Sequence, residues 1–205
     1  LHLPADKICA IPNPLSFSEI ASPEILDHKE KEVVIVSRMV DLCKRISLAL
    51  KIWHLVEADS ASDGWRLKII GDGENLQAYK KLAKTLNLRR MEFLGRQNSQ
   101  PYYQKASLAM MTSSFEGWGL TLTESQQFGT IPLAFGSYAS AKDIITDGEN
   151  GFLIPYGNLS LYAKRLLELM QDSDKRIQMA KNCLESAQRF EIQKIVPQWK
   201  KLLQD

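Results

Sequence analysis

The feature that most constrains the fold of this chain is the regular alternation of short apolar runs with longer amphipathic segments. Six apolar runs of four or five residues recur along the 205 residues. Runs this short and this apolar are typical of strands buried on both faces, as in parallel sheets. The sequence therefore predicts an α/β fold with a doubly wound parallel sheet of about six strands. The six runs are Val33–Ser37, Arg66–Ile70, Met91–Leu94, Leu108–Met111, Ile131–Phe135 and Gly151–Ile154.

Helical periodicity between the runs supports this alternation. Ile46, Leu50, Trp53 and Val56 fall at helical spacing, so we expect them to form the core face of a helix after the first run. Ser22–Lys31 is polar and is predicted to be a loop or linker. Three closing helices are predicted at Asn158–Gln171, Asp174–Phe190 and Gln193–Leu203.

Composition excludes several classes of protein. The net charge of +2 is too small to indicate a nucleic-acid-binding protein. Three cysteines form no metal-like spacing and no disulfide framework, so a reducing cytoplasm is expected. No apolar run approaches the roughly 20 residues that span a bilayer. One dense basic stretch is predicted as a solvated helix face, with an acidic membrane surface as the alternative: Lys80, Lys81, Lys84, Arg89 and Arg90.

The segment Ser113–Gly129 combines two carboxylates with a glycine loop. Glu116 and Glu124 lie eight positions apart, and Gly117-Trp118-Gly119 lies between them. The fourth apolar run precedes the loop and a predicted helix follows it. In α/β proteins, such strand-to-helix junctions lie where ligands bind. Because carboxylates repel phosphate, we expect the glutamates to meet hydroxyls, for which sugars are the obvious source. The alternative is a capped surface helix with two solvated glutamates.

Positive charge is supplied by residues that follow the first run. Arg38 and Lys44 lie there, and Gly71-Asp72-Gly73 follows the second run. In a doubly wound sheet these strand ends share one edge and can line one crevice. Arginine binds phosphate bidentately and lysine acts as a compact charge, so the pair could hold a diphosphate. Taken alone, each cation could equally be a surface residue.

Together these motifs resemble the donor-binding, C-terminal half of a retaining GT-B glycosyltransferase of family 4 (glycosyl transferases group 1). The resemblance covers nearly the whole chain. It implies a Rossmann-like sheet that forms one half of a GT-B fold. The motifs that carry it are Pro4–Ile8, Ile11–Asn13, Ser37-Arg38 with Lys44, Gly71–Gly73, Phe93–Gly95, Glu116–Leu120 with Glu124, and Asp147–Leu153.

The resemblance also implies an activity and its partners. It implies a hexosyltransferase that moves a sugar from a UDP- or GDP-linked donor to an acceptor, with retention of configuration and without a metal ion or other cofactor. The implied pathway is polysaccharide biosynthesis in the cytoplasm. The implied partners are the nucleotide-sugar donor and an N-terminal acceptor domain, with no nucleic acid. Contact of the full-length enzyme with the inner face of the membrane is left open.

By the same resemblance, individual residues receive roles. Arg38, Lys44 and Glu116 are the predicted catalytic residues, the two cations on the diphosphate and Glu116 on the sugar hydroxyls. Cations placed in advance stabilise the leaving diphosphate and can replace a divalent metal ion. Glu124 would hold the ribose, and Leu94–Arg96 would approach the base. The predicted donor-binding set is Gly71, Gly73, Arg96, Glu116, Gly117, Trp118, Gly119, Leu120, Thr121 and Glu124.

The chain departs from the family pattern at several positions. Trp118 replaces the usual Phe and keeps an aromatic ring. Ser125-Gln126-Gln127 replaces Ala-Met-Ala, so these side chains are expected either to alter the pocket or to face solvent. Gly136–Ala141 replaces a glycine-rich stretch with a glutamate, which leaves loop closure around the donor open. Asp172-Ser173-Asp174 fits a metal motif of another glycosyltransferase class, but it is predicted to cap a helix, and no metal ligand is expected.

Two units are expected within the chain. Residues 1–190 are predicted to form the nucleotide-sugar-binding domain, and residues 191–205 a helix that packs toward an absent N-terminal domain. Ile195, Trp199 and Leu202 are expected to be partly exposed on that helix. The chain begins at Leu1, so we expect a fragment that binds donor weakly and transfers nothing by itself. Two alternatives remain, namely a nucleotide-sugar epimerase of the same fold and a non-catalytic nucleotide-binding or interaction domain.

Overall fold

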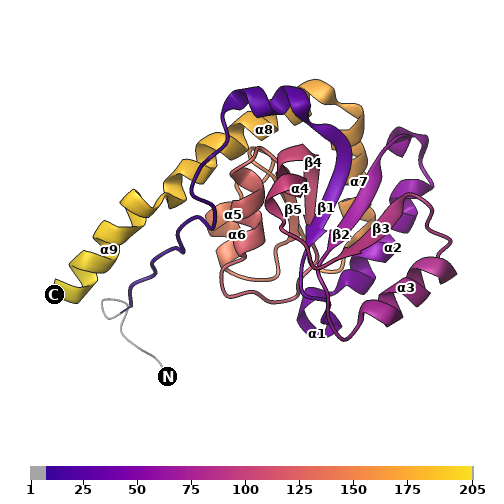
Figure 1. Ribbon diagram of the computed structural model, residues 1–205, viewed down its shortest axis with the longest axis horizontal. Coiled ribbons are helices and arrows are strands. Elements are labelled where there is room, and N and C mark those ends of the chain that lie inside the picture. The colour runs from indigo at the N-terminus through magenta and orange to yellow at the C-terminus, as the bar shows by residue number, and fades with distance from the viewer. Residues whose placement is uncertain (1–7, 205) are drawn as a thin grey trace.

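Six parallel strands form one sheet at the centre of the chain, which the computed structural model describes from residue 8 to residue 204 (Figure 1). They lie in the order β3-β2-β1-β4-β5-β6, and every neighbouring pair is parallel. This arrangement confirms the predicted doubly wound sheet, and each predicted run overlaps one strand. The strands are β1 (Glu30–Val36), β2 (Arg66–Ile70), β3 (Met91–Gly95), β4 (Ala106–Met111), β5 (Ile131–Phe135) and β6 (Phe152–Ile154).

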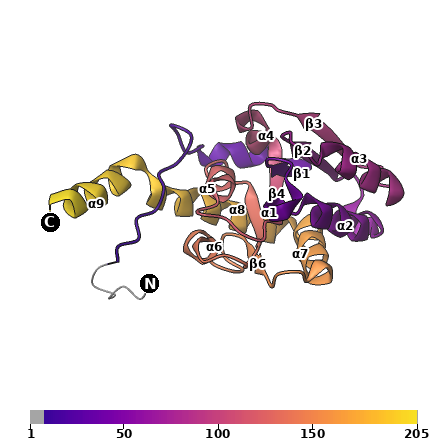
Figure 2. The same cartoon turned by 90° about the horizontal axis from the view of Figure 1, so that it is seen from below.

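Helices cover both faces of the sheet (Figure 2). The α2, α3 and α7 helices lie on one face, and α4 and α5 lie on the other. The α8 helix contacts α5, α7 and β5, and its buried Met179 and Cys183 join the same core as α2 and α7. The α-helices of the described chain are α1 (Asp41–Lys44), α2 (Ile46–Glu57), α3 (Leu76–Thr85), α4 (Gln100–Lys105), α5 (Leu120–Gln126), α6 (Ser140–Ile144), α7 (Leu159–Gln171), α8 (Ser173–Ala187) and α9 (Ile192–Gln204). Short 3₁₀ helices are η2 (Pro23–His28), η3 (Ser60–Ser62) and η4 (Gln188–Phe190).

Successive strand residues point into two different cores. Val33 and Ile35 of β1 belong to the larger core under α2 and α7, whereas Val34 packs with Tyr103 and Phe128 on the opposite face. Because both faces are covered, all five residues of β5 are buried, as near-continuous apolar runs require. The four residues predicted as the core face of α2 are fully buried: Ile46, Leu50, Trp53 and Val56.

The entry into the sheet differs from the prediction. The sequence predicts a polar loop over Ser22–Lys31, but this segment forms η2 and then enters β1 at Glu30. Tertiary contacts explain the difference, because two charged side chains in and next to this segment bind partners inside the protein. Lys29 is half-buried and turns its ammonium group into the protein, and Glu32 of β1 forms an ion pair with Lys68 of β2.

Lys29 fastens this entry to the amino-terminal edge of the sheet. Its ammonium group donates to the carbonyls of Tyr103 (2.7 Å) and Ala106 (2.9 Å) and to Oγ1 of Thr130 (2.9 Å). All three donors of the ammonium group are therefore satisfied. Burial lowers the pKa of Lys29 to about 7 because it penalises the charged form.

The α9 helix extends away from the sheet beside the N-terminal segment (Figures 1 and 2). Ile195 in its first turn is buried, at 1% exposure, so the predicted partial exposure of this residue is wrong. Here α9 still contacts η4. Trp199 and Leu202, farther along, are 48% and 44% exposed, as predicted. None of the described helices is both long and apolar enough to span a bilayer. The predicted entry motif Pro4–Ile8 lies outside the described residues except for Ile8.

Two glycines after β2 allow its loop to contact the loop after β1. A Cβ atom on Gly71 would lie 1.8 Å from the carbonyl oxygen of Ser37, and one on Gly73 would lie 2.7 Å from that of Met39. Met39 N–H donates to the carbonyl of Asp72 over 2.9 Å, which joins the two loops. Gly71 has a φ of +135°, a region that favours glycine. These glycines thus have a packing role that supports the loop carrying Arg38.

We expect Gly71→Ala to destabilise the protein by about 2–4 kcal/mol, because the methyl group would collide with the Ser37 carbonyl. Gly157→Ala is the matched control, because Gly157 also has a positive φ but faces open space. The control should lose only about 1 kcal/mol. Urea denaturation measures both losses, and equal losses would contradict the requirement for close approach.

Lys29 should make stability depend on pH. Since the folded pKa is about 7 and an unfolded lysine titrates near 10.4, the unfolded state binds more protons between these values. Stability should therefore rise with pH across this window, by about 2 kcal/mol between about pH 6 and pH 9 relative to Lys29→Met. Exposed Lys31 provides the control Lys31→Met, which should keep the rise. Parallel pH profiles for wild type and Lys29→Met would refute the prediction.

Candidate functional site

The candidate site lies where the strand order reverses between β1 and β4. These two strands pair directly, with Val34 opposite Ala109. After β1 the chain continues to β2 on one side of this pair, and after β4 it continues to β5 on the other side. Such a reversal opens a crevice at the carboxyl ends of the two strands. Most of the predicted site residues lie on the loops and helices that follow these two strands.

An ion pair joins the two sides of this crevice. Lys44 ends α1, Glu116 lies in the loop after β4, and Nζ approaches Oε1 to 2.5 Å. Ser113 Oγ donates to the same carboxylate oxygen over 2.6 Å. The side chains of Lys44 and Glu116 are only 18% and 13% exposed, so the pair is partly shielded from solvent. Two residues predicted from separate motifs, 72 positions apart, are thus in direct contact.

The backbone reinforces this contact. Ser114 N–H donates to the carbonyl of Cys43 over 2.8 Å, and Thr112 Oγ1 donates to the carbonyl of Lys44 over 3.1 Å. The loop after β4 is therefore fixed to α1 beside the ion pair. These hydrogen bonds fix the backbone positions of Glu116 and Lys44 relative to each other, in addition to the contact between their side chains.

Arg38 and Arg96 have no such fixed partner. Arg38 is exposed on the loop after β1, on the same edge as Lys44, and within the described chain its guanidinium forms no ion pair. Arg96 is exposed after β3, the edge strand, and is separated from β1 by β2. The structure thus brings Arg38 to the crevice edge and leaves Arg96 at the periphery.

Glu124 lies on α5, half-buried, eight positions after Glu116. The hydroxyl group of Tyr103 donates to its Oε2 atom over 3.3 Å. Gly117, Trp118 and Gly119 form the loop before this helix. Leu120 and Thr121, which also belong to the predicted donor-binding set, are its first two residues. All these residues therefore belong to one loop-and-helix unit after β4.

Tyr138 also lies beside the site and has no signal in the sequence motifs. Burial raises the pKa of its phenol, and the charge of Glu116 raises it further, so the group stays protonated. A Cβ atom on Gly119 would lie 3.5 Å from the Tyr138 hydroxyl. Trp118 packs edge-on against Phe190, with ring centroids 5.5 Å apart. These aromatic contacts fix the glycine loop from the side of α6 and η4.

The polar residues that depart from the family pattern do not face solvent, which was one of the two expectations for them. Ser125, Gln126 and Gln127 are fully buried, so they do not face solvent, and none joins the Lys44–Glu116 cluster. Gln127 Nε2 donates to the carbonyls of Phe17 (3.0 Å) and Glu19 (3.1 Å). Gln126 Nε2 donates to the carbonyl of Ile144 over 3.3 Å, so the two glutamines attach α5 and its end to neighbouring segments. The Ser125 hydroxyl instead donates to the carbonyl of Leu122 within α5.

The Asp172-Ser173-Asp174 motif caps a helix, as predicted. Asp172 Oδ1 accepts a hydrogen bond from Lys175 N–H over 2.9 Å at the start of α8. Across residues 8–204, no group of three or more His, Cys, Asp or Glu side chains could hold a metal ion.

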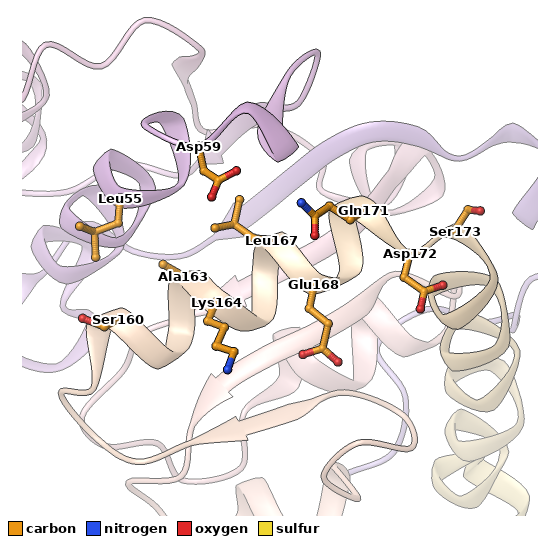
Figure 3. Close-up of a pocket in the computed structure, with 10 residues that line it drawn as sticks. All are labelled: Leu55, Asp59, Ser160, Ala163, Lys164, Leu167, Glu168, Gln171, Asp172 and Ser173. Atoms are coloured by element: carbon orange, nitrogen blue, oxygen red, sulfur yellow. The ribbon is translucent and has the colours of Figure 1, made fainter.

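A separate groove lies between α2 and α7 (Figure 3). It has a volume of about 930 Å³ and contains none of the predicted site residues. Among its carboxylates, Glu168 is already paired with Arg165 and Lys175.

Comparison with known proteins connects this geometry to a family. The family described as Glycosyl transferases group 1 matches residues 16–186. An uncharacterized glycosyltransferase of Haemophilus influenzae is 28% identical over 200 residues, which cover 97% of this chain and 55% of the relative. An alpha-1,4-N-acetyl-D-galactosaminyltransferase of Campylobacter jejuni is 29% identical over 192 residues, covering 93% and 53%. The chain thus spans about half the length of these relatives.

A solved structure has the same fold. TarM of S. aureus, in a complex that contains UDP, superposes with a TM-score of 0.80 at 24% identity. The match covers 96% of this chain and 38% of TarM. The six-stranded α/β architecture is therefore that of known glycosyltransferase structures.

Proposed function

The chain belongs to the family Glycosyl transferases group 1, and from this premise we propose that it is the donor-binding half of a sugar-transferring enzyme. The donor is a nucleotide diphosphate sugar. The other half of the enzyme, which corresponds to the remaining length of the relatives, binds the acceptor. This chain alone binds donor and does not transfer the sugar.

The observation that carries the proposal is the Lys44–Glu116 ion pair at the switch point of the sheet. An ammonium group has three donors, and within the described residues the Lys44 side chain uses one of them, on Glu116. The other donors are available to phosphate oxygens. Glu116 Oε2 likewise has no hydrogen-bond partner among the described residues, so it can accept from a sugar hydroxyl.

The proposed roles follow from this chemistry. Arg38 and Lys44 hold the diphosphate, Glu116 holds the donor sugar, and Glu124 holds the ribose. Breaking the bond between sugar and phosphate leaves negative charge on the diphosphate. Cations fixed in advance stabilise that charge, so the reaction proceeds without a divalent metal ion. Loss of one such cation is expected to slow transfer by about 100-fold or more.

The relatives support the finer points of the proposal. UDP is named in the TarM complex, so we propose a uridine diphosphate sugar as the donor. The Campylobacter jejuni relative is named for an alpha-1,4 linkage. Because common UDP-hexoses are alpha-linked, an alpha-linked product corresponds to retention of configuration, which we propose for this enzyme too. We place the reaction in the cytoplasm.

The proposal predicts that Lys44 binds the phosphate groups of the ligand. Lys44→Ala should weaken UDP binding about tenfold or more, because a charge-assisted hydrogen bond to phosphate is lost. Uridine lacks phosphates, so its affinity should stay within about twofold. Thermal-shift titration of the chain with UDP and with uridine measures both affinities.

The matched control is Lys164→Ala, which removes an exposed lysine from the α2–α7 groove (Figure 3). It should bind UDP like the wild type. If Lys44→Ala weakened UDP and uridine equally, the lysine would act through folding, and its proposed contact with the diphosphate would be wrong. If neither the wild type nor Lys164→Ala bound UDP, the donor-binding function itself would be wrong.

A further inference from the structure

Tyr103 of α4 is held rigidly beneath the proposed donor site. It is 1% exposed, and its ring stacks on Phe128 with an interplanar angle of 4° and a centroid separation of 6.5 Å. Phe17 contacts the same ring edge-on at 6.4 Å. The Tyr103 carbonyl accepts hydrogen bonds from Lys29 and from Thr130. The ring and the backbone of this residue are therefore both fixed.

From this fixed ring, the Tyr103 hydroxyl donates to Oε2 of Glu124 over 3.3 Å. Burial raises the pKa of Tyr103 well above its usual value, and the negative charge of Glu124 raises it further. The phenol therefore stays protonated and can only act as a donor toward the carboxylate. The Glu124 carboxylate has no other hydrogen-bond partner among residues 8–204.

We propose that Tyr103 is a positioning residue: it holds Glu124 by one carboxylate oxygen and leaves the other, Oε1, directed to the ribose of the donor. This inference rests on the proposed function, in which Glu124 binds the ribose hydroxyls. A glutamate side chain has three rotatable bonds, and ordering them on binding lowers affinity. Tyr103 orders the side chain before the ligand arrives.

A purely structural role for Tyr103 makes a different prediction. If its hydroxyl only stabilised the fold, its removal would weaken all ligands alike or none. If it acts through Glu124, its removal should affect only ligands that have ribose hydroxyls. The ratio of the affinities for UDP and for 2′,3′-dideoxy-UDP therefore separates the two roles.

The experiment is a thermal-shift or calorimetric titration of the chain with these two nucleotides. The wild type should prefer UDP by about tenfold or more, since Glu124 binds its hydroxyls. Tyr103→Phe, which keeps the ring, should lower UDP affinity about fivefold to tenfold and leave the dideoxy affinity within about twofold. Tyr102→Phe is the matched control: it lies on the same helix, its hydroxyl has no hydrogen-bond partner in the described chain, and it should keep the wild-type ratio.

Glu124→Ala, which removes both acceptor oxygens, separates this inference from the proposed function. It should abolish the preference for UDP, and adding Tyr103→Phe to it should cause no further change in that preference, because the tyrosine acts through the Glu124 side chain. If Glu124→Ala left the preference intact, the ribose role of Glu124 and the inference would both be wrong. If it abolished the preference while Tyr103→Phe kept it, the inference alone would be wrong.

If the melting curve shows that Tyr103→Phe does not fold, a second variant, Glu124→Asp, tests the same inference. Glu124→Asp keeps the charge but withdraws the carboxylate from the Tyr103 hydroxyl by one methylene group. The inference expects a reduced preference for UDP in this variant. An unchanged preference would overturn it.

Discussion

The contact between Lys44 and Glu116 is the interaction on which the arrangement of the site depends. It joins the segment after β1 to the loop after β4, the two strands between which the sheet changes direction. A partly buried charge is costly unless it is paired and hydrogen-bonded. Glu116 meets both conditions, because Lys44 and Ser113 share its Oε1 atom. Removing either charged partner would leave the other in a poorly solvated crevice.

A second set of contacts runs from the opposite edge of the sheet toward the same crevice. Lys29 and Thr130 anchor the backbone of Tyr103 near the amino ends of β4 and β5, and the Tyr103 hydroxyl reaches Glu124 on α5. Gln127 adds an attachment of the same helix to the segment around Phe17. The two glutamates are thus supported independently, one across the crevice and one through the core.

The sequence was sufficient to predict the sheet and the placement of Lys44 and Glu116 at one crevice, but not the direct ion pair between them. The reason is that apolar runs define parallel strands, and parallel strands bring their carboxyl ends to one edge. The roles of Lys29, Tyr103 and Gln127 could not be predicted in this way. Locally, Lys29 is one charged residue in a polar stretch, and Tyr103 is an aromatic residue on a short helix. Their partners lie from 21 to 110 positions away, and only tertiary packing brings them together.

Both glutamates share a feature that bears on selectivity. Each is held through one oxygen, Glu116 by Oε1 and Glu124 by Oε2, and neither second oxygen has a partner within residues 8–204. The two negative charges of Glu116 and Glu124 equal in number the positive charges of Arg38 and Lys44, so the four proposed donor-binding side chains carry no net charge. In the proposed function, inorganic phosphate or pyrophosphate would gain two cations but meet two carboxylates that it cannot satisfy. A nucleotide sugar supplies the diphosphate to the cations and hydroxyl donors to both carboxylates. Under the proposed function, the site would select the complete donor by disfavouring inorganic phosphate and pyrophosphate as well as by binding the donor itself.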